Sequence, residues 1–170
     1  MKDIDLVEIL LVEDNPSDAE MTIRALRKND IIHNILHLKD GLDALNFLFG
    51  RGNYAGRDIS ITPKVILLDL KMPKVGGIEV LTKIKETRAL KHIPVFVLTS
   101  SKQDPAMRIC LKLGAANFIL KPVNLEGFVA ALSDVKMYWP LTDAEIKTSL
   151  LLGSPIVPKI IKLPVVLCNE

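Results

Sequence analysis

The chain has 170 residues, of which 49% are hydrophobic and 25% charged, and its formal net charge is +2. These proportions are typical of a packed globular domain and exclude a disordered chain. A near balance of charge also argues against a nucleic-acid-binding surface, which would need a clustered excess of Lys and Arg.

Compartment and membrane association are also constrained by the sequence. Residues 1–5 carry two acids where a signal peptide needs a basic start, and no apolar run reaches the roughly 18 residues of a membrane helix. Cys110 and Cys168 are too few for a disulfide scaffold or a zinc site. We therefore expect a cytoplasmic protein with reduced thiols that contacts neither membrane nor nucleic acid.

Apolar segments alternate with segments of helical spacing as far as about residue 138. In chain order the predicted elements are strand 8–12, helix 16–29, strand 34–38, helix 42–49, strand 65–68, helix 78–84, strand 95–98, helix 106–113, strand 117–120 and helix 125–135. Five strand–helix pairs with continuously apolar strands predict an α/β fold, a five-stranded parallel sheet with helices on both faces.

Apolar spacing identifies the second and third predicted helices. Leu42, Leu45 and Phe49 recur at helical intervals and mark the second helix. Ile78, Leu81 and Ile84 are expected to form the inner face of the third helix.

Polar residues follow four of the predicted strands. Glu13 and Asp14 come after the first strand, Asp69 after the third, Thr99 after the fourth and Lys121 after the fifth. Each alone has an ordinary explanation as a helix cap or a solvated side chain. Ligands of open parallel sheets bind at the carboxyl ends of the strands, so all five together indicate a site.

The residue types at this edge indicate phosphoryl chemistry. Three converging carboxylates would repel one another unless a cation lay among them, and hard oxygen ligands with places left for water suit Mg²⁺. A cation beside a lysine and a hydroxyl can neutralise the oxygens of a phosphoryl group. The pattern therefore predicts phosphoryl transfer to a carboxylate.

Four segments carry a resemblance to a known family: residues 9–15, residues 67–73 followed by Gly76-Gly77, residues 94–100 and residues 118–122. In order and spacing they resemble the receiver domain of two-component response regulators across residues 7 to 138. The resemblance implies a (βα)5 flavodoxin-like three-layer sandwich. It also implies that a sensor histidine kinase transfers a phosphoryl group from a phosphohistidine to Asp69.

The resemblance further assigns the metal ligands. Asp14 and Asp69 are expected to bind Mg²⁺ directly, the backbone carbonyl of Lys71 is a third ligand, and Glu13 holds a metal-bound water. Glu13-Asp14 stands where many family members have two aspartates.

The family also implies roles around the phosphoryl group. Lys121 is expected to pair with one phosphoryl oxygen and the Thr99 hydroxyl to move onto another. Phe118 takes the switch position, where the ring turns inward when Thr99 moves, although a plain core phenylalanine is the alternative. The Lys121-Pro122 peptide bond is expected to be cis.

Partners are implied by a narrower resemblance to stand-alone regulators of bacteriophytochromes, carried by residues 50–63 and 85–94. The expected phosphodonor is a sensor histidine kinase, of phytochrome type or another, or a phosphotransfer protein. The expected output is contact with a downstream protein through the face formed by residues 106–113, 117–120 and 125–135. Such a chain is a phosphoacceptor that assists its own phosphorylation and dephosphorylation, and not an enzyme.

Three rival functions fit the residues less well. A phosphatase of the haloacid-dehalogenase type needs an acid two residues after its nucleophile, where this chain has Lys71. A flavodoxin-type FMN carrier needs a phosphate-binding loop after the first strand, but residues 13–18 are acidic there and would repel a phosphate. A receiver serving only as a scaffold is disfavoured because every phosphorylation residue is present.

The predicted division places a receiver domain at residues 1–139 and an apolar tail at residues 140–170. We expect a short helix from Thr142 to Leu152, then extended chain, because Pro155, Pro158 and Pro164 prevent a regular helix. A tail of this length is too short for a DNA-binding output domain. Its many aliphatic residues disfavour a disordered linker and leave three outcomes, which are packing on the receiver, packing on a second copy, or binding a partner. Because receivers commonly pair through their last helix, the resemblance implies a homodimer in which the tail covers apolar surface.

Overall fold

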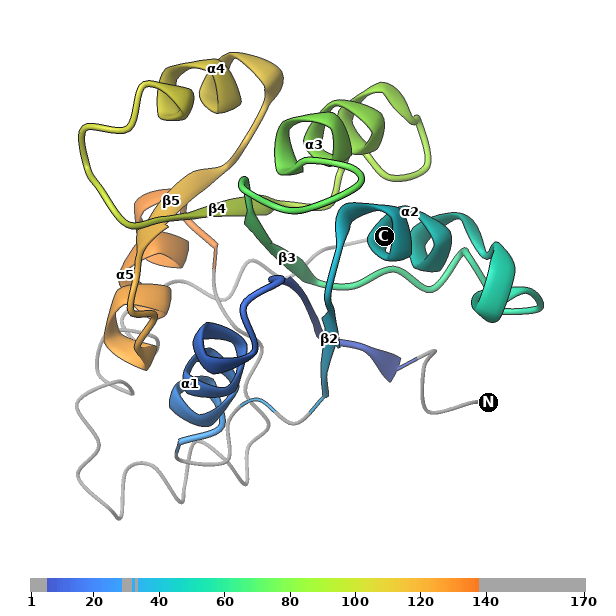
Figure 1. The fold of residues 1–170 in the computed structure, drawn as a ribbon, viewed down its shortest axis with the longest axis horizontal. Helices are drawn as coiled ribbons and strands as arrows, with labels where there is room; N and C mark the ends of the chain where they lie inside the picture. The colour runs from blue at the N-terminus through green and yellow to red at the C-terminus, as the bar shows by residue number, and fades with distance from the viewer. Residues whose placement is uncertain (1–5, 29–31, 33, 138–170) are drawn as a thin grey trace, which may run out of the picture.

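The computed structural model describes residues 6–28, 32 and 34–137 (Figure 1). The strands are β1 (Ile9–Val12), β2 (Ile35–Leu38), β3 (Val65–Asp69), β4 (Val95–Thr99) and β5 (Asn117–Leu120). The helices are α1 (Pro16–Leu26), α2 (Gly41–Phe49), α3 (Gly77–Glu86), α4 (Ala106–Leu113) and α5 (Leu125–Asp134), with a 3-10 turn, η2 (Gly52–Tyr54), after α2.

The five strands form one sheet in the order β2-β1-β3-β4-β5. All neighbouring pairs are parallel, and Ile9 of β1 lies in register with Ile35 of β2 and Val65 of β3. The predicted five-stranded parallel sheet is confirmed. Every strand therefore presents its carboxyl end at the same edge.

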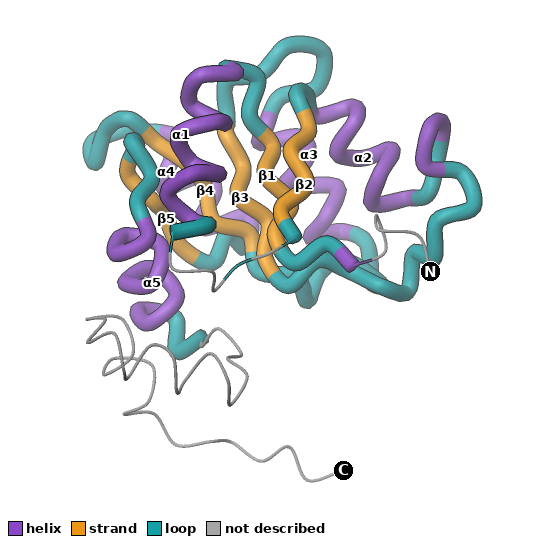
Figure 2. Tube along the Cα trace, turned by 90° about the horizontal axis from the view of Figure 1, so that it is seen from below, coloured by secondary structure: helices purple, strands orange, loops and turns teal. Residues whose placement is uncertain are grey.

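Helices cover both faces of the sheet and enclose two separate cores (Figures 1 and 2). On one face Leu11 and Leu67 pack with residues of α1 and α5. On the other face Leu10 and Leu68 pack with residues of α2, α3 and α4. Successive side chains of a strand point to opposite faces, so burial on both sides explains why β1 and β3 are apolar at every position before Asp69.

Side-chain caps begin three of the helices just past a strand or a short loop. Asn15 Oδ1 accepts from the N–H groups of Ser17 and Asp18, and Pro16 occupies the first turn of α1. Asp40 caps α2 and Asn124 caps α5 in the same way. These caps satisfy N–H groups that a helix leaves unpaired, and they fix where each loop at the carboxyl edge ends.

The predicted inner face of α3 was partly wrong, because Ile78 is 36% exposed while Val80 is fully buried. In α2, Leu42 of the apolar pattern that marked the helix is 44% exposed, and Ala44 is fully buried. Both helices begin with a buried glycine that lies against backbone, and a Cβ on Gly41 would come within 2.2 Å of the Val75 carbonyl oxygen. These close approaches set the rotation of the two helices about their own axes, and the spacing of apolar residues does not reveal such approaches.

The remaining points concern the end of helix α1 and the C-terminal part of the chain. Helix α1 stops at Leu26, earlier than the predicted residue 29. The predicted tail at residues 140–170, its division from the receiver at residue 139, and Cys168 lie outside the described residues. Among those described, Cys110 of α4 is a fully buried free thiol, and no helix there has the length and hydropathy needed to span a membrane.

Candidate functional site

A cleft of about 340 Å³ opens at the carboxyl edge of the sheet. All five residues predicted from the strand ends line it: Glu13, Asp14, Asp69, Thr99 and Lys121. They come from β3 and β4 and from the segments that directly follow β1 and β5. The parallel topology thus brings together residues that lie more than a hundred positions apart.

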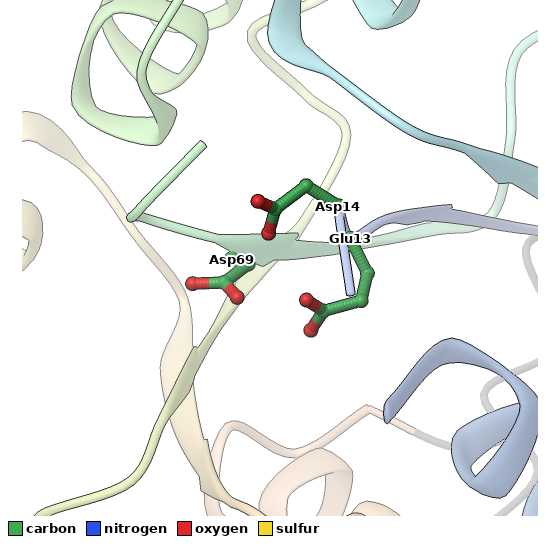
Figure 3. Close-up of side chains that lie close together, drawn as sticks. All are labelled: Glu13, Asp14 and Asp69. Carbon is green, nitrogen blue, oxygen red and sulfur yellow. The ribbon is translucent and has the colours of Figure 1, made fainter. Parts of the chain in front are cut away.

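Three carboxylates gather at one side of this cleft (Figure 3). Glu13, Asp14 and Asp69 each offer a carboxylate oxygen within 4.8 Å of the others. Glu13 and Asp69 are buried, whereas Asp14 is exposed and faces the opening. One exposed member leaves the cluster accessible to an ion from solvent.

Lys121 is the cation that the structure places among these acids. Its Nζ lies 2.5 Å from Glu13 Oε2 and 2.7 Å from Asp69 Oδ2. A further carboxylate oxygen, Asp18 Oδ2, lies 3.2 Å away. The predicted cis peptide bond between Lys121 and Pro122 is confirmed.

Burial governs the electrostatics of Glu13, whose side chain is only 1% exposed. Loss of solvent raises the pKa of Glu13 to about 6, although the Lys121 ammonium and the Asn15 N–H act in the opposite direction. The same contacts also change the pKa of the Lys121 ammonium. Burial favours its neutral form, but the close contacts with the carboxylates of Asp69 and Glu13 outweigh burial and raise the pKa of Lys121.

Backbone contacts hold the acids in place. His37 Nε2 lies 2.7 Å from the Glu13 carbonyl oxygen, and Asn15 N donates to Glu13 Oε1 at 3.1 Å. Asp69 Oδ1 accepts from the backbone N–H of Lys71 at 3.1 Å. Asp69 Oδ2 is thus the oxygen directed at Lys121, and the two carboxylates have fixed orientations.

Thr99 and Phe118, the two residues of the predicted switch, lie on the neighbouring strands β4 and β5. Thr99 is buried, and its hydroxyl donates to the Ser101 carbonyl oxygen at 3.0 Å and accepts from the Ser101 N–H at 3.2 Å. Phe118 of β5 is partly buried against the core on the α2, α3 and α4 side. In this structure the Thr99 hydroxyl bonds its own loop.

The residues fit a hard divalent cation. Glu13 Oε2 is buried and makes no hydrogen bond of normal geometry despite the nearby ammonium, so it can accept a further donor such as a metal-bound water. Oxygen ligands of two or three carboxylates are what such cations select. Lys71, whose carbonyl was predicted to be a ligand, also lines the cleft, with its side chain exposed.

Sequence reasoning missed Asp18 as a member of this site. It lies in the first turn of α1 and contacts Lys121 directly. Asp14 precedes the helix, so helical spacing does not link the two acids, and a first-turn acid alone does not indicate a site. Asp104, whose Oδ1 accepts from the Ala106 N–H at the start of α4, also lines the cleft and was not predicted.

Comparison with known proteins agrees with this geometry. Residues 9–133 match the response regulator receiver domain. The probable methanogenesis regulatory protein FilR2 of Methanothrix harundinacea is 38% identical over 132 residues, which cover 77% of this chain and 82% of that protein. The response regulator Rcp1 of Synechocystis is 37% identical over 131 residues, covering 77% of this chain and 87% of Rcp1.

Solved structures point the same way. The bacteriophytochrome response regulator AtBRR is 42% identical with a TM-score of 0.73, covering 79% of this chain and 96% of that one. The Mn²⁺-bound form of Rcp1 is 37% identical with a TM-score of 0.60, covering 75% of this chain and 88% of Rcp1. With five parallel strands, an acidic cluster at their carboxyl edge and a match over most of its length, this chain belongs to the response regulator receiver family.

Proposed function

We propose that this chain is the phosphoacceptor of a two-component phosphorelay and that Asp69 accepts the phosphoryl group. The observation that carries the proposal is the contact of Asp69 Oδ2 with Lys121 Nζ at 2.7 Å, beside two further carboxylates. Asp69 ends the central strand β3 and faces an open cleft. A sensor histidine kinase or a phosphotransfer protein supplies the phosphoryl group.

The transfer is a substitution at phosphorus. A carboxylate oxygen of Asp69 forms the new P–O bond as the P–N bond to the donor histidine breaks, and the imidazole nitrogen that leaves takes up a proton. Mg²⁺, when bound by Asp14, Asp69 and the Lys71 carbonyl with a water held by Glu13, supplies positive charge that offsets repulsion between the carboxylate and the anionic donor. Asp69 ends the reaction modified, so the chain is a phosphoacceptor and not an enzyme that turns over.

Two side chains then respond to the new charge. The Lys121 ammonium pairs with a phosphoryl oxygen, since Asp69 Oδ2 already lies within its reach. The Thr99 hydroxyl leaves Ser101 and donates to a second phosphoryl oxygen, and Phe118 turns into the space that Thr99 vacates. The hydroxyl only exchanges one acceptor for a charged one, which is the stronger bond.

The phosphoacceptor assignment is tested by labelling with acetyl phosphate. We expect the mass of one phosphoryl group to be added in the presence of Mg²⁺ and not with a chelator. Asp69→Asn keeps the shape and should abolish labelling, whereas Asp104→Asn, in the same cleft, should label normally. Normal labelling of Asp69→Asn would refute the assignment, and turnover of phosphate monoesters would favour the phosphatase alternative.

Contact with a downstream protein is proposed through α4, β5 and α5. Ile109 and Leu111 of α4 and Leu120 of β5 are 51%, 52% and 43% exposed. Exposed large apolar side chains are common in protein interfaces.

Two proposals on partners have direct tests. Several similar structures are bacteriophytochrome response regulators, which supports a kinase of that type as phosphodonor. Phosphotransfer profiling against the sensor kinases of the source organism should show that type reacting fastest.

Homodimer formation through the tail predicts a solution mass of two chains for the full protein and of one for a version ending at Trp139. Equal masses would refute it.

A further inference from the structure

Asp18 is a third carboxylate neighbour of Lys121 and comes from a different element than the other two. Its Oδ2 lies 3.2 Å from Lys121 Nζ, on the α1 side of the cleft. Glu13 and Asp69, the other two neighbours, belong to the group of acids that can hold a metal ion, and Asp18 does not. The Lys121 ammonium thus lies within 3.2 Å of three carboxylates, of which Asp18 alone has no share in the cation cluster.

The position of Asp18 is fixed by the start of α1. Its backbone N–H donates to the Asn15 side chain at 3.1 Å, in the cap that follows Glu13 and Asp14 directly. The helix dipole also stabilises an acid in the first helical turn, and this alone would explain an Asp at this position. The dipole does not explain why the side chain turns into the cleft and contacts a lysine 103 residues away.

The solvent exposure of Asp18 argues against a role that only stabilises the fold. The Asp18 side chain is 40% exposed, and ion pairs with one exposed partner contribute little to stability. The Lys121 side chain is only 15% exposed and cannot easily exchange its partners for water. Asp18 therefore matters more to where the ammonium lies than to how stable the domain is.

We propose that Asp18 is a positioning residue that holds the Lys121 ammonium in the cleft when Glu13 and Asp69 are shared with a divalent cation. A second positive charge beside these two carboxylates weakens the hold of Lys121 on them. Asp18, which is not a member of the cation cluster, then remains as its partner. The ammonium stays within reach of the phosphoryl oxygens, and Asp69 is released to act as the nucleophile. This role rests on the proposed phosphoacceptor function.

The contact can be measured directly on the Lys121 ammonium in ¹⁵N-lysine-labelled full-length protein at low temperature, with the signal assigned by its loss in Lys121→Met. We expect a slowly exchanging Lys121 signal in wild type both without metal and with saturating Mg²⁺. Asp18→Asn should lose the signal when Mg²⁺ is added, whereas Asp104→Asn, which removes a charge from the same cleft without touching Lys121, should keep it. Retention in Asp18→Asn, or equal loss in both variants, would overturn the proposal.

The rate of labelling by acetyl phosphate gives a second readout in which the two explanations have opposite signs. Removing a negative charge near an anionic donor should by itself leave labelling unchanged or faster, which we expect for Asp104→Asn. Asp18→Asn should slow labelling about threefold or more, and it should have no further effect in a Lys121→Met background. Faster labelling, or an equal slowing in that background, would overturn the proposal. If wild type is not labelled at all, the phosphoacceptor function fails, while the Lys121 signal still reports on Asp18.

Discussion

The loop after β3 and the loop after β4 both flank the cleft, yet they are held in different ways. Residues 70–76 are fixed by contacts with distant parts of the fold. Lys74 Nζ donates to Asp40 Oδ2 at 2.7 Å, and the Val75 carbonyl packs against Gly41. Gly77 at the end of this loop lies so close to β3 that a Cβ would come within 2.3 Å of the Asp69 carbonyl oxygen.

Residues 100–105 are held by hydrogen bonds to near neighbours in sequence. Thr99 and Ser101 bond each other, Gln103 N donates to Ser101 Oγ, and Ala106 N donates to Asp104 Oδ1. Residues 100 to 103 are exposed. A loop supported by itself can rearrange at little cost to the rest of the domain.

The difference separates two tasks of one site. The loop after β3 keeps Asp69 in a fixed place relative to Glu13 and Asp14, as a nucleophile requires. The loop after β4 holds the hydroxyl of Thr99, the last residue of β4, through Ser101, so the proposed movement of this hydroxyl needs only local bonds to change. The carboxyl edge therefore has a rigid loop after β3 and, next to it, a loop after β4 that can rearrange locally.

The largest expected effect comes from filling the close approach at Gly77. Gly77→Ala should lower the free energy of unfolding by about 3 kcal/mol, because the new methyl group meets backbone that cannot move aside. Gly76→Ala is the matched control, since its Cβ would lie 3.8 Å from the nearest atom, and should cost less than about 1 kcal/mol. Urea denaturation measures both, and equal losses would mean that the loop after β3 is not tightly held.

A smaller effect is expected at Asp40, which caps α2 and pairs with Lys74. Asp40→Ala removes both interactions and should cost about 1 to 2 kcal/mol. Asp40→Asn retains an acceptor for the Asp43 N–H and loses only the ion pair, so it should cost clearly less. If Asp40→Asn is as damaging as Asp40→Ala, the cap contributes nothing.

The pH dependence of this pair has a defined sign. The hydrogen bond from Lys74, and next that from the Asp43 N–H, hold the pKa of Asp40 below its ordinary value. A carboxyl whose pKa is lowered by folding stabilises the protein above its unfolded pKa, and this stabilisation is lost as the pH falls through the folded pKa. The difference between wild type and Asp40→Asn should thus be full at pH 7 and shrink below about pH 4. A difference that does not change with pH would contradict the ion pair.

The smallest effect is expected in the loop after β4. Ser101→Ala removes the acceptor of the Gln103 N–H in an exposed segment and should change the free energy of unfolding by no more than about 0.5 kcal/mol. Thermal unfolding compared with wild type measures it. A loss as large as that of Gly77→Ala would show that this loop supports the fold as strongly as the loop after β3.

Sequence reasoning predicted the sheet and the five strand-end residues because both depend on patterns along the chain. A strand buried on both faces is apolar at every position, and the carboxyl ends of parallel strands must meet. Contacts between backbones are different, since Gly41 and Gly77 leave no apolar signal. The exposed position of Ile78 was therefore predicted wrongly.

Asp18 was missed for another reason. Acids near a helix start are common, so Asp18 looked like one more first-turn acid. Only the fold shows that Lys121, at the other end of the domain sequence, comes within 3.2 Å of it. The partners of the site could be predicted where each follows a strand, and not where one lies on a helix.

The reactivity of the buried Cys110 thiol reports on how often the structure around α4 opens. Loss of solvent raises the pKa of the Cys110 thiol, and the thiolate is the form that reacts with disulfide and maleimide reagents. In a chain with Cys168 replaced by serine, the modification rate would therefore follow how often α4 separates from the sheet. A receiver that moves this helix when it is phosphorylated would register that movement as a change in thiol reactivity, without any attached dye.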